Sequence, residues 1–357
     1  MTNAILVTGG SGYIGSHTCK VLASRGWTPV VLDDCDRGHR AAVRWGPLYV
    51  GDIADAALLE RIVSEHQIRS MVHFAAYAYV GESMQEPEKY FLNNVAKSMT
   101  LLSTAIAAGV RHVVFSSTCA TYGMPEQMPI RETQPQRPVN PYGESKVAVE
   151  RALHWFGATR GLGWMALRYF NAAGADPDGE IGENHDPEPH LVPRVIQAAL
   201  GQLSHVDIFG TDYPTSDGTA VRDYIHVTDL ADAHVRALDH LMRGGESMAI
   251  NLGTGCGHSV REVVHAVERR TGLPVPVVEG PRRAGDPAVL VADPSLARQV
   301  LEWTPRHSSL DEIVDTAWRW QASRATRTTP DAASPATTPD AASPATAPDA
   351  ARAGLKP

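Results

Sequence analysis

The chain has few cysteines, and none of them is placed for a disulfide framework or a zinc site. Only four occur in 357 residues, without a C-x-x-C pair: Cys19, Cys35, Cys119 and Cys256. The fifteen histidines are also scattered and show no H-E-x-x-H pattern. Disulfide frameworks and metal sites are both recognised in a sequence by characteristic spacings of cysteine and histidine. We therefore expect reduced thiols, a cytoplasmic location and no metal.

The chain also lacks long apolar runs and clusters of basic residues. No hydrophobic segment reaches the roughly 20 residues that span a membrane, and no signal peptide precedes the first expected strand. The net charge is −8, without a lysine or arginine patch, so nucleic acid and anionic membranes are poor partners. With 43% hydrophobic residues, the chain is expected to form one large or two smaller globular domains.

What the sequence does contain is a glycine-rich turn between a strand and a helix. An apolar run at 4–7 leads into Gly9, Gly12 and Gly15, and a helical pattern covers 13–25. Gly9 would allow the tight turn, Gly12 the close approach of a pyrophosphate, and Gly15 the packing of helix on strand. The free N–H groups at the start of the helix would hold the phosphates. The pattern predicts a dinucleotide-binding turn.

An acidic residue indicates which dinucleotide is bound. The second expected strand, 28–32, ends at Asp33, whose carboxylate can accept a hydrogen bond from a ribose 2′-hydroxyl. The same carboxylate would repel a 2′-phosphate, which favours NAD over NADP. Arg37 lies close by in the sequence and weakens this preference a little.

Strands and helices alternate through the N-terminal half. Expected strands at 48–50, 70–74 and 113–115 are separated by helical stretches at 54–64 and 87–108. This alternation predicts an α/β fold, a Rossmann-type doubly wound parallel sheet with helices on both faces. Ligands bind beyond the carboxyl ends of such strands. Those ends carry Asp33, Asp52, Phe74 and the hydroxyls of Ser116, Ser117 and Thr118.

The pattern changes after about residue 171. Loops rich in Pro, Gly and Asp precede expected helices at 193–200 and 228–243 and expected strands at 222–227 and 249–252. We therefore expect a smaller C-terminal α/β substrate domain that is interleaved with the first.

These observations divide the chain into three parts. The predicted NAD-binding domain comprises 1–172 with 222–252, and the predicted substrate domain comprises 173–221 with 253–324. A nine-residue Pro/Ala/Thr repeat dominates 325–357, which has almost no bulky apolar residue. Such a segment cannot bury enough surface to fold, so we predict a disordered C-terminal tail.

A tyrosine and a lysine on one helix face form the candidate catalytic pair. Tyr142 and Lys146 are four residues apart near the start of an expected helix that runs to about Arg160. A free phenol has a pKa near ~10, too high for a base at neutral pH, and we expect a nearby ammonium to lower it. Thr118, at a strand end, could bind the phenol or a substrate hydroxyl.

The two motifs together resemble those of the extended short-chain dehydrogenase/reductases. Longer stretches are similar to the UDP-glucose 4-epimerases of that family, at 7–17, 51–53, 73–75, 80–83, 93–95, 115–117, 141–143, 167–171, 221–227, 251–253 and 282–286. The resemblance covers residues 1 to about 320. It implies NAD-dependent inversion at C4 of a UDP-hexose, UDP-glucose or UDP-galactose, through a 4-keto sugar and NADH. It also implies a homodimer packed through helices, one of them bearing Tyr142.

The resemblance further implies a role for each site residue. The catalytic residues would be Tyr142 as acid and base, Lys146 and Thr118. The residues at the cofactor would be Gly9, Gly12, Tyr13, Ile14, Gly15, Asp33, Asp52, Ile53, Phe74, Ala75, Ala76, Asn94, Lys146 and Phe170. The residues at the UDP-sugar would be Thr118, Tyr142, Asn171, Leu191, Phe209, Arg222, Arg283 and Asp286. The two arginines suit a diphosphate because their forked guanidinium groups are always charged.

Three positions depart from the family pattern and leave other functions open. Thr118 stands where many relatives have serine, Ala78 where some have lysine, and Leu290 where some carry a tyrosine against the sugar. The smaller Leu290 would leave room for a 2-acetamido group, as in UDP-N-acetylglucosamine. A UDP-pentose or UDP-uronate epimerase, a nucleotide-sugar 4,6-dehydratase and a non-catalytic NAD-binding protein are further alternatives. Cysteine and alanine follow Thr118 in place of the dehydratase acid pair, and the intact tyrosine–lysine pair argues against a mere binder.

Overall fold

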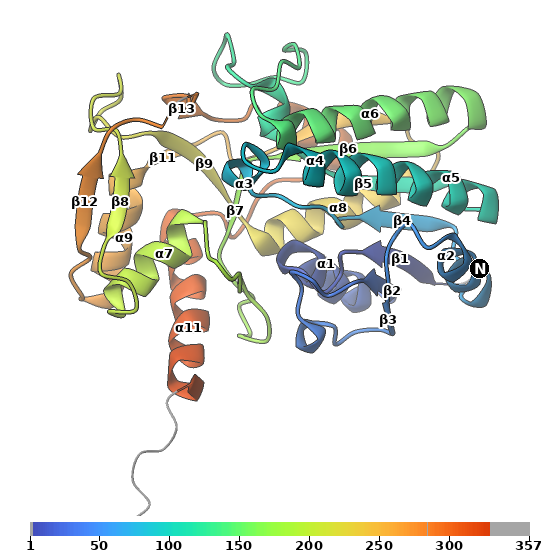
Figure 1. Cartoon of the computed structure of the whole chain (residues 1–357), viewed down its shortest axis with the longest axis horizontal. Coiled ribbons are helices and arrows are strands. Elements are labelled where there is room, and N and C mark those ends of the chain that lie inside the picture. Colours follow the sequence, from blue (N-terminus) through green and yellow to red (C-terminus); the bar gives the residue numbers. More distant parts are fainter. Residues whose placement is uncertain (1–2, 284, 329–357) are drawn as a thin grey trace, which may run out of the picture.

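Seven parallel strands form the central sheet in the computed structural model, which describes residues 3–283 and 285–328. Every neighbouring pair in this sheet is parallel. The doubly wound fold predicted from the sequence is thereby confirmed (Figure 1). The strand order is β3 (Leu48–Val50), β2 (Thr28–Asp33), β1 (Ala4–Thr8), β4 (Ser70–His73), β5 (His112–Thr118), β6 (Gly163–Tyr169) and β10 (Met248–Leu252).

Helices cover both faces of this sheet because its strands are apolar on both sides. In β1, Ile5 and Val7 belong to the core on one face, and Leu6 belongs to the core on the other. The first face is covered by α1 (Tyr13–Ser24), α8 (Val227–Met242) and α10 (Ser295–Leu301). The second face is covered by α2 (Ala56–Glu65), α5 (Ser98–Ala108) and α6 (Pro141–Arg160).

The segment between β4 and β5 was expected to contain one long α-helix, but the structure divides it into several helical pieces. After α3 (Val80–Ser83) come α4 (Pro87–Tyr90), a π-helical segment η2 (Phe91–Lys97) and α5, which ends at Gly109 with a φ of 110°. The wider π turn often marks functional positions, and here it contains the buried Asn94. Short 3-10 helices complete this half, η1 (Arg40–Ala42) and η3 (Cys119–Tyr122).

A second, smaller region lies beside the large sheet, at the left of Figure 1. Its four-stranded sheet is built around β9 (Val221–His226), which pairs with β7 (Asn171–Ala173), β11 (Gly257–Ser259) and β13 (Val289–Leu290). A two-stranded sheet joins β8 (Val206–Phe209) and β12 (Val277–Gly280). A separate apolar core forms where three helices pack together, α7 (Leu191–Ala199), α9 (Val260–Thr271) and α11 (Leu310–Thr328).

The two regions are more interleaved than the sequence suggested. Strand β9 was expected in the first domain but pairs within the second sheet, whereas α10, expected in the second, packs on α8 and β10. The division into domains stays a prediction. Helix α11 continues to Thr328, and the rest of the predicted tail, 329–357, lies outside the described residues. Within the described part of the chain, no helix is long and apolar enough to cross a bilayer.

Candidate active site

The glycine-rich turn between β1 and α1 is shaped by close backbone contacts. Gly9 has a φ of 73°, and its N–H donates to the Leu32 carbonyl at 3.0 Å. A Cβ on Gly9 would lie 2.6 Å from the Ala75 nitrogen, and one on Gly15 would lie 2.2 Å from the Gly9 oxygen. A Cβ on Gly12 would meet only the Gly9 oxygen, at 3.3 Å. Gly9 and Gly15 are therefore needed for packing, and the space beside Gly12 is open for an approaching group.

The turn and the neighbouring carboxylate fit a dinucleotide. Helix α1 starts without a side-chain cap, so its first N–H groups can be satisfied by a phosphate. Asp33 ends β2 and is buried. Its two oxygens accept from the N–H groups of Ser11 at 2.9 Å and Cys35 at 2.8 Å. These bonds hold the carboxylate beside the turn and leave lone pairs for ribose hydroxyls.

Two further predicted cofactor residues follow the ends of β3 and β4. Asp52 comes after β3, where it accepts from Lys97 at 2.6 Å, and the attraction of that ammonium holds its pKa below the usual range although partial burial opposes this. Phe74 follows β4 and packs on His234 with ring centroids 4.7 Å apart. Behind them, Ile53 is part of the apolar core. The carboxyl edge of the sheet therefore gathers these residues as the sequence predicted.

Asn94 and Tyr13 have their polar atoms committed within the chain. The Asn94 amide accepts from the Tyr77 N–H at 2.9 Å and donates to the Tyr77 carbonyl at 2.9 Å and to Ser145 at 3.1 Å. The Tyr13 hydroxyl donates to the Gly174 carbonyl at 2.6 Å. These bonds suit residues that hold the walls of the candidate site together, with Asn94 joining η2 to the helix that carries the candidate catalytic pair.

Helix α6 brings the candidate catalytic pair against the end of β5. The helix begins with Asn140, whose side chain accepts from the Gly143 N–H. Its first two turns carry Tyr142 and Lys146, which are both buried, with 8% and 2% of their surface exposed. The Lys146 ammonium donates to the Ser116 carbonyl at 2.9 Å and lies 5.8 Å from the centre of the Tyr142 ring. The end of β5 and the first turns of α6 therefore lie against each other, as the sequence predicted.

The protonation states of the pair differ from the expectation. Burial raises the pKa of Tyr142, and only a hydrogen bond with Thr118 acts strongly in the other direction. Burial also lowers the pKa of Lys146 to about 7, although Glu150 opposes this. The prediction that Lys146 lowers the pKa of Tyr142 is therefore wrong for the chain alone. That prediction assumed that the attraction of the ammonium for the phenolate outweighs burial, whereas burial penalises the charged form of both groups.

A buried ion pair, which the sequence did not reveal, fixes α6 to the sheet. Glu150, one turn beyond Lys146, accepts from the Arg168 side chain of β6 at 3.0 and 2.6 Å. Its carboxylate also accepts from Ser117 and Gln136, and Arg168 donates to the Tyr122 hydroxyl at 2.9 Å. Both charged groups are buried. The i, i+4 spacing of Lys146 and Glu150 was visible in the sequence, but their partners were not.

Several predicted substrate residues form two pairs of contacts within the second region. Arg222 in β9 forms an ion pair with Asp286 and donates to the Val221 carbonyl at 2.7 Å. Arg283 stacks on the Phe209 ring, with its guanidinium carbon 3.9 Å from the ring centre. Each of these two guanidinium groups therefore has a partner within the chain, an aspartate for Arg222 and an aromatic ring for Arg283.

A small apolar cluster lies beside one of the remaining substrate positions, and the other, Leu191, packs on the core of α7, α9 and α11. The small cluster contains the buried Phe170 and is lined by Leu290, which is opposite Arg222 in the pairing of β13 with β9. Asn171 starts β7, directly after Phe170, and Leu191 starts α7. Both are partly exposed. Ala76 is also partly exposed, in the loop that follows Phe74.

Comparison with known proteins gives one consistent result. Residues 5–253 match the model of the NAD dependent epimerase/dehydratase family. The chain is 52% identical over 322 residues to a UDP-glucose 4-epimerase of Rhizobium meliloti, which covers 90% of this chain and 98% of that protein. The crystal structure of UDP-glucose 4-epimerase from Brucella ovis in complex with NAD is 51% identical, with a TM-score of 0.87, and covers 89% of this chain and 98% of that one.

A further solved structure is that of a UDP-glucose 4-epimerase from Bifidobacterium longum in complex with NAD+ and UDP. It is 37% identical, has a TM-score of 0.85, and covers 90% of this chain and 99% of that one. The glycine turn, the carboxylate beside it and the tyrosine–lysine pair thus occur in a chain that matches these enzymes over almost its whole described length. The chain belongs to the NAD-dependent epimerase/dehydratase family, among the UDP-glucose 4-epimerases of the extended short-chain dehydrogenase/reductases.

Proposed function

We propose that the protein interconverts UDP-glucose and UDP-galactose by NAD-dependent epimerisation at C4. The observation that carries this proposal is the position of Tyr142 and Lys146, buried against the end of β5 at the same sheet edge as the glycine turn. A protein that only binds NAD needs the turn but not this pair. The similarity to UDP-glucose 4-epimerases along the chain supports the same reaction.

Tyr142 is the proposed acid and base. When bound, NAD+ supplies the hydride chemistry at C4 and brings a positive charge that favours the phenolate. The phenolic oxygen of Tyr142 takes the proton of the 4-hydroxyl and later returns it to the same oxygen, after the sugar has turned its other face toward the cofactor. Thr118 ends β5 and opposes the rise of the Tyr142 pKa, and its hydroxyl is proposed to hold the phenol and the sugar hydroxyl in line. Lys146, anchored on the Ser116 carbonyl, orients the nicotinamide ribose and supports the phenolate.

The diphosphate of the substrate is the proposed ligand of Arg222 and Arg283. Asp286 holds the Arg222 guanidinium, and the Phe209 ring holds that of Arg283. A guanidinium fork can donate two parallel hydrogen bonds to phosphate oxygens. Anchoring the substrate at its diphosphate leaves the sugar free to turn, which inversion at C4 requires.

The experiment is turnover of UDP-galactose to UDP-glucose by the Tyr142→Phe variant. We expect a loss of at least ~100-fold in kcat, because general acid–base catalysis contributes on the order of 10² to 10⁴. The purified variant should retain NAD, since Tyr142 is not needed for the glycine turn. A matched control is Tyr122→Phe, which removes a buried hydroxyl on the neighbouring η3. Near-normal turnover of Tyr142→Phe would reject the assigned acid and base.

A second candidate substrate is UDP-N-acetylglucosamine. Leu290 lines the cluster beside Phe170 and lies opposite Arg222, so its size affects the space near the sugar. We expect Leu290→Tyr to reduce turnover of the N-acetylated sugar more than that of UDP-galactose. If the parent enzyme forms no UDP-N-acetylgalactosamine in a coupled assay, this candidate is excluded.

Homodimer formation and a cytoplasmic location complete the proposal. Two large apolar side chains are mostly exposed, Trp155 (65%) on α6, the helix expected at the interface, and Leu92 (64%) on η2, which packs against α6. Burying them in a second copy would remove this apolar surface from water. Light scattering should give a dimer for the parent and a monomer for Leu92→Glu. The four cysteines are free, which suits the reducing cytoplasm and can be checked by cell fractionation.

A further inference from the structure

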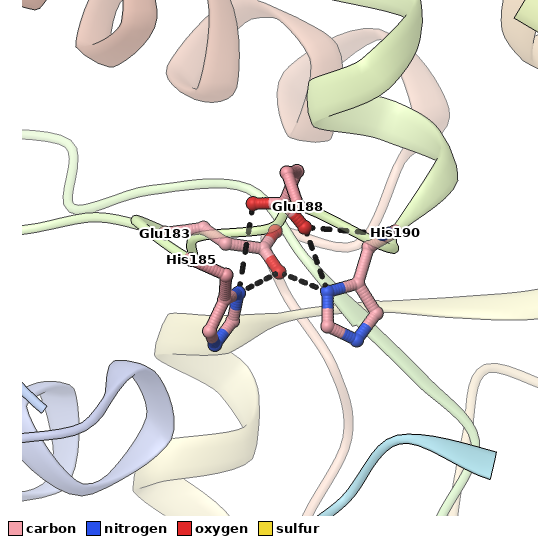
Figure 2. A group of neighbouring side chains, drawn as sticks. All are labelled: Glu183, His185, Glu188 and His190. Atoms are coloured by element: carbon pink, nitrogen blue, oxygen red, sulfur yellow. Dashed lines mark hydrogen bonds and ion pairs between the residues drawn. The ribbon is translucent and has the colours of Figure 1, made fainter. Parts of the chain in front are cut away.

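Two carboxylates and two imidazoles converge in the loop between β7 and α7, away from the proposed catalytic pair. Figure 2 shows Glu183, His185, Glu188 and His190 pointing toward one another. The Nδ1 atom of His190 lies 2.7 Å from Glu183 and 3.0 Å from Glu188. The Nδ1 atom of His185 lies 3.2 Å from Glu183 and 3.5 Å from Glu188. Four candidate donor atoms therefore surround one point, all within 4.8 Å of one another.

The polar atoms of this cluster are not satisfied by each other. Glu183 is 4% exposed, yet its Oε1 atom makes no hydrogen bond, and neither does the Nδ1 atom of His185. Nδ1 of His190 hydrogen-bonds Glu188. Each Nδ1 carries at most one hydrogen but lies near an oxygen of both carboxylates, so the two rings leave several carboxylate lone pairs without a donor. Leaving buried polar atoms unpaired is costly.

A second group of carboxylates in the same loop has a lysine as its partner. Asp176, Asp178 and Glu180 also lie close together. Lys20 places its ammonium among them, at 2.8, 2.7 and 2.8 Å. That cluster already has its cation. The Glu183 and Glu188 carboxylates instead lie against the imidazoles of His185 and His190.

We propose that Glu183, His185, Glu188 and His190 bind one divalent transition-metal ion, with Zn²⁺ as the best fit. Two imidazole nitrogens and two carboxylate oxygens are ligands of the kind that zinc takes. With bonds of about 2.1 Å, the ligand atoms of a tetrahedral site are about 3.4 Å apart. The nitrogen–oxygen separations of 2.7–3.5 Å between the imidazoles and the carboxylates need only a small expansion to reach that geometry. One ion at the centre would satisfy all four side chains at once.

The surroundings indicate a structural role for this ion. The Glu183 carbonyl accepts from Trp320 of α11 at 2.8 Å, and the His185 ring packs edge-on against Tyr13 of α1. Tyr79 also contacts both imidazole rings. Bound metal would therefore tie α11 to the loop beside the glycine turn and fix the segment that leads into α7. All four protein ligands are used, which is typical of structural sites and not of catalytic ones.

The test is metal binding by the full-length protein without a polyhistidine tag. The metal-stripped enzyme is titrated with Zn²⁺ against a chromogenic chelator, and the metal content is measured by mass spectrometry after dialysis. We expect one zinc ion per chain and a rise in the thermal unfolding midpoint on adding Zn²⁺. The His185→Gln/His190→Gln variant should bind at least ~100-fold more weakly, because even losing a supporting residue costs 10- to 100-fold.

Matched variants keep the outcome clear. Glu188→Gln preserves the side-chain shape and should also weaken zinc binding, so it replaces the double variant if that protein does not fold by circular dichroism. Asp178→Asn alters the cluster held by Lys20 and should bind zinc as the parent does. The proposal is overturned if zinc saturates far below one ion per chain. It is also overturned if the histidine or glutamate variants bind as tightly as Asp178→Asn.

Discussion

Breaking the buried ion pair between Glu150 and Arg168 should be among the most damaging single changes to this fold. The pair joins α6 to β6 through two charge-assisted hydrogen bonds, and both residues are nearly inaccessible, at 5% and 6%. Glu150→Ala leaves the guanidinium buried without its counter-charge and removes the acceptor of Ser117 and Gln136. Losing one partner of a buried pair costs about 3–5 kcal/mol. We expect a loss of that size in the free energy of unfolding.

The assay is urea denaturation followed by circular dichroism, with saturating NAD+ for every variant. Glu126→Ala is the control, because its ion pair with Arg137 is exposed and should be worth less than about 1 kcal/mol. The double variant Glu150→Leu/Arg168→Met removes both charges and should lose clearly less than Glu150→Ala. A cost below about 1 kcal/mol for Glu150→Ala, or a double variant no better than the single one, would refute this reasoning.

Three further predictions concern the site and its surroundings. Gly15→Ala would place a Cβ 2.2 Å from the Gly9 oxygen; we expect a loss of about 1–3 kcal/mol in stability and less NAD in the purified protein, read from its absorbance. The pKa of Lys146 falls to about 7 on burial, so the unfolded chain binds more protons between pH 7 and the ordinary lysine value. Stability should therefore rise with pH above 7, and the rise should be shallower in Lys146→Met, as denaturation at several pH values will show. Burial lowers the pKa of His73 to about 3, so the contribution of the neutral imidazole to stability is complete above pH 6.5 and is lost as the pH falls toward 3. His73→Gln should therefore make the free energy of unfolding depend less on pH between 3 and 6.5. An unchanged slope in that range would contradict this prediction.

The sequence predicted the first sheet well because its strands are encoded locally. The run that contains Ile5, Leu6 and Val7 is apolar on both sides, as a strand between two helical layers must be. Strand β6 was not predicted, since Arg168 interrupts its apolar pattern and the glutamate that neutralises it comes from another element. The short strands β7, β11 and β13 exist only through pairing with β9, a long-range event without a local signal.

The closeness of Tyr142 and Lys146 to the end of β5 could be predicted from the sequence, but the electrostatics of the candidate site could not. The positions of Tyr142 and Lys146 follow from helical spacing, whereas their pKa values depend on burial, which only the tertiary structure reveals. The cluster of Glu183, His185, Glu188 and His190 was missed for a different reason. Its E-x-H-x-x-E-x-H spacing is visible in the sequence, but nothing local shows that the loop folds the four side chains onto one point.

Because β10 comes late in the chain, the large sheet can be completed only late in synthesis. This strand forms the edge of the large sheet beside β6, yet it comes after β7, β8 and β9, which belong to other sheets. A ribosome therefore has to release residues up to Leu252 before the sheet can be completed. Until then the nascent chain presents the unpaired edge of β6 to other molecules, the kind of surface that chaperones protect from aggregation.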